Sequence, residues 1–124
     1  MAGAQMKVLI VNDDLSLFER LQGYCAGNAP DISVLSAISG PRALAIAAYQ
    51  KPDVIVIDAA IPDIDGYELA AKFRLEQGAD GGRVVMLAAV LDEVAATRAK
   101  DAGAVAQISV DASLPEMVTA VRRA

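Results

Sequence analysis

The strongest constraint on the fold is an alternation along the chain, in which five short runs of branched apolar residues are separated by stretches with helical periodicity. The apolar runs are Lys7–Val11, Asp31–Ile38, Asp53–Asp58, Arg83–Ala89 and Ala104–Val110. Three of them are continuously apolar, which is typical of strands that are covered on both faces. Strands that alternate with helices at such short spacing favour a parallel sheet with helices on both faces. The sequence therefore predicts a doubly wound α/β fold of five β-α units.

The segments between the runs carry the marks of helices. Apolar residues recur there at helical spacing: Leu17, Leu21 and Cys25; Leu69 and Phe73; Leu114, Met117, Val118 and Val121. Capping residues predict helix starts at Ser16, Asp65 and Ser113 and helix ends at Gly27, Gly78 and Gly103. No linker interrupts the pattern, so we expect one domain over residues 1–124, with a core of about 6–123 and no output domain in this chain.

The composition excludes several classes of function. Lysine and arginine number 11 against 16 aspartates and glutamates, a net charge of −5, whereas a surface that binds nucleic acid needs a cationic stripe. No apolar run approaches the roughly 20 residues of a membrane span, and no secretion signal is visible, so we expect a cytoplasmic protein without membrane contact. The absence of histidine excludes serine–histidine and cysteine–histidine hydrolases, imidazole zinc sites and a phosphohistidine carrier.

Carboxylates gather where the predicted strands end, and the carboxyl ends of parallel strands form the site of a doubly wound sheet. Asn12, Asp13 and Asp14 follow the first run, and Asp58 closes the third. An aspartate that closes the apolar run 54–57 costs free energy to bury unless it has a partner or a function. Oxygen ligands in a partly open cleft suit Mg²⁺. In the structural alternative, Asp13 or Asp14 only caps the first helix.

The charge balance at these strand ends gives a prediction about stability. No lysine or arginine follows the strands directly, so the acidic residues are expected to repel one another. Replacing Asp13 or Asp58 by asparagine is therefore predicted to raise the melting temperature in metal-free buffer, unless a bound ion or a helix cap already compensates.

Asp65-Gly66 has a structural alternative of its own, in which it forms only a turn and a helix start.

The residues around the acidic cluster resemble the receiver domain of two-component response regulators. The resemblance covers the whole chain and rests on Lys7–Asp14 (KVLIVNDD) and, more specifically, on Asp53–Leu69 (DVIVIDAAIPDIDGYEL). The loop of the family reads D-x-x-x-P-x-x-D-G, and this chain matches it with Asp58, Pro62, Asp65 and Gly66. The resemblance implies a flavodoxin-like, five-stranded parallel sheet with helices on both faces.

The resemblance also implies a signalling chemistry rather than an enzyme. By analogy with the family, Asp58 accepts a phosphoryl group from the phosphohistidine of a histidine kinase or phosphotransfer protein in a phosphorelay. Asp13, Asp58 and the backbone carbonyl of Ala60 would hold Mg²⁺, with Asn12 or Asp14 as further contacts through water. Catalysis would be limited to weak self-phosphorylation from a donor and self-dephosphorylation.

The chain departs from the family pattern at four positions. Asn12 stands where the family has the first acid of a pair, Ala88 where it has a threonine or serine, Val110 where it has a lysine, and Gln107 at its aromatic switch position. With an acid, a hydroxyl and a lysine missing, we expect weak Mg²⁺ binding and a blunted phosphorylation switch, since a ligand shifts an equilibrium only by its differential affinity for the two states.

Three functions therefore stay open. The first is a phosphoacceptor with a degenerate site, and the second is a pseudo-receiver that acts only as a protein-interaction module. The third is a flavodoxin-like small-molecule binder, which is disfavoured because no glycine-rich phosphate loop follows the first strand.

The resemblance further implies a surface for a protein target or for self-association. It would be formed by the helix around Ala95–Ala102, the strand Ala104–Val110 and the helix from Leu114. Its expected residues are Val94, Arg98, Gln107, Met117, Val121 and Arg122. We predict that Met117 and the pair Arg122-Arg123 are available to a partner, with a core position as the alternative for Met117.

Overall fold

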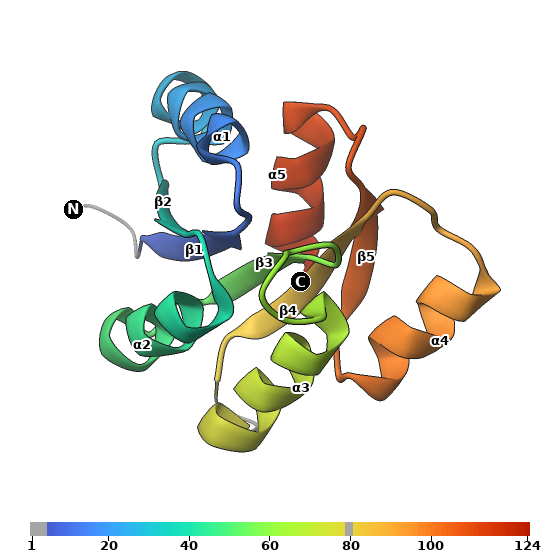
Figure 1. The fold of residues 1–124 in the computed structure, drawn as a ribbon. Coiled ribbons are helices and arrows are strands. Elements are labelled where there is room, and N and C mark those ends of the chain that lie inside the picture. The colour runs from blue at the N-terminus through green and yellow to red at the C-terminus, as the bar shows by residue number, and fades with distance from the viewer. Residues whose placement is uncertain (1–4, 79–80) are drawn as a thin grey trace.

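The computed structural model describes residues 5–78 and 81–124, in which strands and helices alternate (Figure 1). The strands are β1 (Met6–Val11), β2 (Ile32–Ala37), β3 (Val54–Asp58), β4 (Arg83–Ala88) and β5 (Ala106–Ser109). The helices are α1 (Leu15–Asn28), α2 (Gly40–Gln50), α3 (Gly66–Gln77), α4 (Glu93–Asp101) and α5 (Leu114–Arg123). The strands pair in the order β2-β1-β3-β4-β5 and all pairs are parallel, which confirms the predicted doubly wound sheet.

The helices form two layers, one on each face of the sheet (Figure 1). Successive residues of β1 point to opposite faces, as the pleat of a strand requires. Val8 and Ile10 pack in one apolar cluster with α1 and α5, whereas Leu9 and Val11 pack in the other with α2, α3 and α4. The central strands therefore need apolar residues at every position, and this explains their continuous apolar runs.

The start of α1 differs from the prediction. Asp14, and not Ser16, is the N-cap, because the Asp14 side chain accepts a hydrogen bond from the Ser16 backbone N–H at 2.9 Å. The chain turns directly after β1, so the helix begins two residues earlier than a Ser16 cap would allow. The predicted stop at Gly27 is also wrong, since α1 continues to Asn28 and the cap is Ala29.

The other predicted helix boundaries are confirmed. Asp65 caps α3, and Ser113 forms a reciprocal capping box with Glu116 at the start of α5. Gly78 and Gly103 follow α3 and α4 with φ angles of +68° and +86°, in the left-handed region that favours glycine.

Helix α5 corrects a prediction about the exposed surface. Met117 and Val121 are 3% and 2% exposed and pack in the same cluster as Leu17 of α1. The prediction that Met117 is available to a partner is therefore wrong, and the alternative, a core position, is confirmed. Arg122 lies outside the core, and its two terminal nitrogens donate to the carboxylate of Asp31 at 2.7 and 2.9 Å.

Helix α4 contacts the core through small side chains. Its inward residues are the small Ala95 and Ala99, while Val94 on the same helix is 67% exposed. Small side chains bury little apolar area, so this helix contributes less to the core than α3 does. In the described part of the chain, no helix is long and apolar enough to cross a membrane.

Candidate functional site

Asp58 lies half-buried at the carboxyl end of β3, next to the end of β1. The pairing of Val11 with Ile57 brings the residues that follow them together. The side-chain amide nitrogen of Asn12 donates to Asp58 Oδ2 at 3.1 Å, and the backbone N–H of Ala60 donates to Asp58 Oδ1 at 2.8 Å. Both oxygens of the carboxylate thus have a neutral hydrogen-bond donor.

The hydrogen bonds continue from Asn12 into the start of α1. Asn12 Oδ1 accepts the backbone N–H of Asp14 at 2.7 Å, and Asp14 in turn caps the helix through Ser16. Hydrogen bonds from Ser16 hold the pKa of the Asp14 carboxyl below its usual value. The backbone N–H of Ser16 has the largest effect, and its side chain adds to it. Asp14 therefore caps the helix, as the structural alternative predicted for this residue. Asp13, between them, is exposed.

The carboxylates do not assemble into a ready metal centre. Within residues 5–78 and 81–124, no three acidic, cysteine or histidine side chains stand close enough to hold a metal ion together. Asn12 directs N–H groups, which cannot bind a cation, at Asp58 Oδ2. The oxygens left for Mg²⁺ are those of Asp13, Asp58 and the Ala60 carbonyl. In this arrangement the residues do not fit a firmly held Mg²⁺.

The two hydrogen bonds change the expected effect of neutralising Asp58. An asparagine at this position offers one oxygen and one NH₂ group, so either Asn12 or Ala60 would lose its acceptor. We now expect Asp58→Asn to lower the metal-free stability by about 1 kcal/mol, the usual cost of an unpaired, partly buried polar group. Thermal unfolding followed by circular dichroism measures this change. Asp13→Asn is the matched comparison, since it is still predicted to raise the melting temperature, and a rise for Asp58→Asn would contradict the assignment.

The loop after Asp58 folds back on the end of β3. The backbone N–H of Gly66 donates to the carbonyl of Ala59 at 3.2 Å. A Cβ at Gly66 would lie 2.5 Å from the backbone oxygen of Asp58, which explains why glycine stands here. Asp63 accepts the backbone N–H of Gly40 at 2.9 Å and so ties the loop to the start of α2, while the neighbouring Pro62 is exposed. The D-x-x-x-P-x-x-D-G pattern thus describes a loop that folds back over the end of β3.

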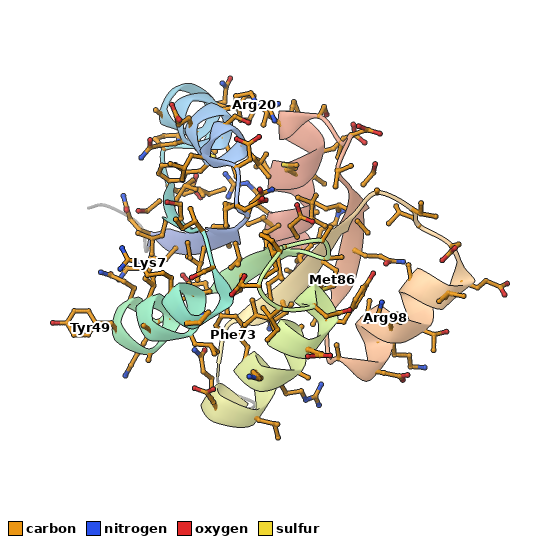
Figure 2. The ribbon with its side chains drawn as sticks, viewed as in Figure 1. Lys7, Arg20, Tyr49, Phe73, Met86 and Arg98 are labelled. Carbon is orange, nitrogen blue, oxygen red and sulfur yellow. The ribbon has the colours of Figure 1, made fainter. Side chains whose placement is uncertain are left out.

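A cation from helix α4 reaches this loop. Arg98 of α4 is labelled in Figure 2. It donates to Asp65 Oδ2 at 2.6 Å, and its guanidinium carbon lies 4.3 Å from the centre of the Tyr67 ring. Partial burial raises the pKa of the Asp65 carboxyl, but the hydrogen bonds from Arg98 and from the backbone of Tyr67 and Glu68 outweigh it, so the pKa is below its usual value. No local sequence pattern indicated this contact, since the two residues are 33 positions apart.

At the ends of β4 and β5, Ala88 and Val110 have apolar side chains. Ala88 is buried at the end of β4 and pairs with Ser109, and the backbone N–H of Val110 donates to the Ala88 carbonyl at 3.0 Å. The side chain of Val110 is apolar and 39% exposed. Gln107 lies in β5, and in the described residues its buried Oε1 atom accepts no hydrogen bond.

Known proteins match this chain in sequence and in fold. A family model for the response regulator receiver domain matches residues 8–122. The DNA-binding response regulator MtrA of Mycobacterium tuberculosis is 29% identical over 118 residues, which cover 95% of this chain and 50% of MtrA. The response regulator protein VraR of Staphylococcus aureus is 31% identical over 119 residues, which cover 95% of this chain and 56% of VraR. The chain therefore spans about half the length of the curated relatives it matches.

Solved structures share the fold. The chemotaxis protein CheY4 of Vibrio cholerae has a TM-score of 0.87 at 23% identity, covering 97% of this chain and 98% of that protein. The response regulator domain of Thermotoga maritima CheB has a TM-score of 0.81 at 27% identity, covering 97% and 96%. Receiver domains are signalling domains that are phosphorylated on an aspartate and typically bind Mg²⁺ at an acidic site. Because the family match extends over nearly all of its residues, the chain belongs to the receiver domains of two-component response regulators.

Proposed function

We propose that this receiver domain signals mainly through protein contacts and that Asp58 is a poor phosphoacceptor. The observation that carries the proposal is the chemistry at the ends of β4 and β5, where Ala88 and Val110 offer neither a hydroxyl nor an ammonium group. A phosphoryl group on Asp58 would bring up to two negative charges, and these two positions would provide no side-chain contact for them. Without differential contacts, phosphorylation has little free energy with which to shift the conformation.

Exposed apolar residues support the protein-contact part of the proposal. Val90, Leu91 and Val94 are 62%, 49% and 67% exposed around the start of α4. Leu91 also lines a groove of about 620 Å³ that runs along Gln107 and Ile108 of β5 to α5. Several exposed apolar side chains close together are typical of surfaces that bind protein. The proposed partner surface is therefore formed by α4, β5 and α5, with the buried Met117 and Val121 removed from the predicted set.

Phosphorylation is tested by treating the protein with a small phosphodonor and Mg²⁺ and measuring its intact mass. We expect only a small fraction to gain a phosphoryl group. The triple variant Asn12→Asp/Ala88→Thr/Val110→Lys, which restores the residue types of the family, is expected to gain several-fold more. Adding Asp58→Ala to the triple variant is the control and should abolish the gain. A parent protein that is phosphorylated as completely as the triple variant would contradict the proposal.

Association is tested by sedimentation over a range of concentrations, with and without the phosphodonor. We expect self-association to depend on concentration and hardly on the donor, because the partner surface has one conformation. Val94→Asp is expected to weaken association by placing a charge in the apolar surface. Tyr49→Asp is the matched control, because Tyr49 is 89% exposed and projects outward from α2 (Figure 2). Strong donor-dependent assembly that Asp58→Ala abolishes would restore the conventional switch.

The proposal extends to partners, metal and compartment. A histidine kinase or a phosphotransfer protein is the proposed donor, and the net charge of −5 supports a role without direct nucleic-acid contact.

Weak Mg²⁺ binding through Asp13, Asp58 and the Ala60 carbonyl stays a prediction. Asp13→Ala is expected to abolish this binding in a calorimetric titration. The proposed compartment is the cytoplasm, where a histidine kinase would present its phosphohistidine.

A further inference from the structure

We propose that Asn12 is a positioning residue, whose side-chain amide holds the Asp58 carboxylate in the place of a cation. An N–H group of the protein, and not a metal ion, then neighbours Asp58 Oδ2. The proposal rests on the proposed function, because it concerns the same site. The observation behind it is the hydrogen bond from Asn12 Nδ2 to Asp58 Oδ2 at 3.1 Å. A neutral donor thus stands beside an oxygen that a metal ion would need.

The orientation of the Asn12 amide is fixed from both ends. Its oxygen accepts the backbone N–H of Asp14 at 2.7 Å, while its nitrogen faces the Asp58 carboxylate. Rotating the amide by half a turn would place N–H groups against the Asp14 N–H and an oxygen against a carboxylate oxygen. Both contacts would then be repulsive. Only one orientation satisfies the two neighbours, and in that orientation the amide presents N–H groups to Asp58.

This orientation makes the amide a competitor of a metal ion. A cation that binds Asp58 Oδ2 must approach close to the amide N–H groups, which carry partial positive charge. The other oxygen, Oδ1, already accepts the Ala60 N–H at 2.8 Å. A Mg²⁺ ion at Asp58 Oδ2 therefore competes with the Asn12 amide for this oxygen, and Asn12 brings no charge in return. An aspartate at the same position would remove the N–H groups and add a carboxylate ligand.

The same amide connects Asp58 to α1. The chain of hydrogen bonds runs from Asp58 through Asn12 to the Asp14 backbone, and the Asp14 side chain caps α1 through the Ser16 N–H. Loss of the amide would release both the carboxylate and the turn that starts the helix. Asn12 is thus expected to matter for stability even in the complete absence of metal.

The test compares thermal unfolding of the parent and of Asn12→Asp in EDTA and in millimolar MgCl₂, together with a calorimetric titration with Mg²⁺. We expect the melting temperature of the parent to be nearly the same in both buffers. Asn12→Asp is expected to melt lower in EDTA, to recover in MgCl₂, and to bind Mg²⁺ at least about tenfold more tightly, because it adds a charged ligand. Asn28→Asp is the matched control, since Asn28 lies exposed at the far end of α1 and its melting temperature should not depend on MgCl₂.

A second variant covers the case in which Asn12→Asp does not fold. Asn12→Ala removes the donor without adding a ligand, so its melting temperature should be lower than that of the parent and should not recover in MgCl₂. A parent that gains as much stability from MgCl₂ as Asn12→Asp does would overturn the proposal. This result would leave the proposed function untouched, because the mass of the donor-treated protein reports phosphorylation separately.

Discussion

Replacing Gly66 by alanine is expected to destabilise the protein by about 3 kcal/mol, the upper end of the range for overpacked sites. The added Cβ would lie 2.5 Å from the backbone oxygen of Asp58 and 2.6 Å from Cα of Ala59. Both atoms belong to the backbone at the end of a buried strand, so no side chain can rotate to make room. Chemical denaturation in urea measures the loss as a lower midpoint at an unchanged slope.

Gly23 provides the matched control for this prediction. It lies inside α1, and a Cβ at this position would meet nothing within 4 Å. Gly23→Ala is therefore expected to stabilise the protein by roughly 0.5–1 kcal/mol, because alanine has the higher helix propensity. Equal stability of the two variants would contradict the close contact of Gly66 with the backbone at the end of β3.

Replacing Asp65 by alanine is expected to cost about 1–2 kcal/mol at neutral pH, because α3 loses its N-cap. The ion pair with Arg98 is lost in the same variant. Asp65→Asn separates the two effects, since asparagine caps a helix as well as aspartate does but carries no charge. We therefore expect Asp65→Asn to lose less stability than Asp65→Ala. Circular dichroism during urea unfolding measures both variants.

The pH dependence of stability gives a second readout for Asp65. The pKa of this carboxyl is below its usual value in the folded protein, so the ionised form is favoured by folding. Its contribution is fully present above the unfolded pKa of about 3.9 and is lost as the pH falls through the lower, folded pKa. The stability difference between the parent and Asp65→Asn should therefore shrink below about pH 4. A difference that stays constant in acid would argue against the ion pair with Arg98.

The sequence was sufficient for the architecture and for the loop from Asp58 to Gly66. Parallel strands covered on both faces need apolar residues at every position, so runs such as Val54–Ile57 are recognisable without a structure. Glycine and capping residues mark helix ends through local backbone geometry, as Asp65 and Gly78 do for α3. The spacing of Asp58, Asp65 and Gly66 also lies within one short segment. All of these signals depend on residues that are neighbours along the chain.

Only the tertiary structure could decide which distant residues meet. The contact of Asn12 with Asp58 depends on the pairing of β1 with β3, and the contact of Arg98 with Asp65 depends on α4 packing beside α3. Met117 is a similar case. Helical periodicity shows which residues share one face of a helix, but not which of them the neighbouring helix α1 covers. Strand order and helix packing result from the burial of the whole apolar core, a collective free energy that no local pattern contains. For this reason the sequence identified the acidic residues, whereas the tertiary structure decided which of them accept hydrogen bonds or form ion pairs, and with which partners.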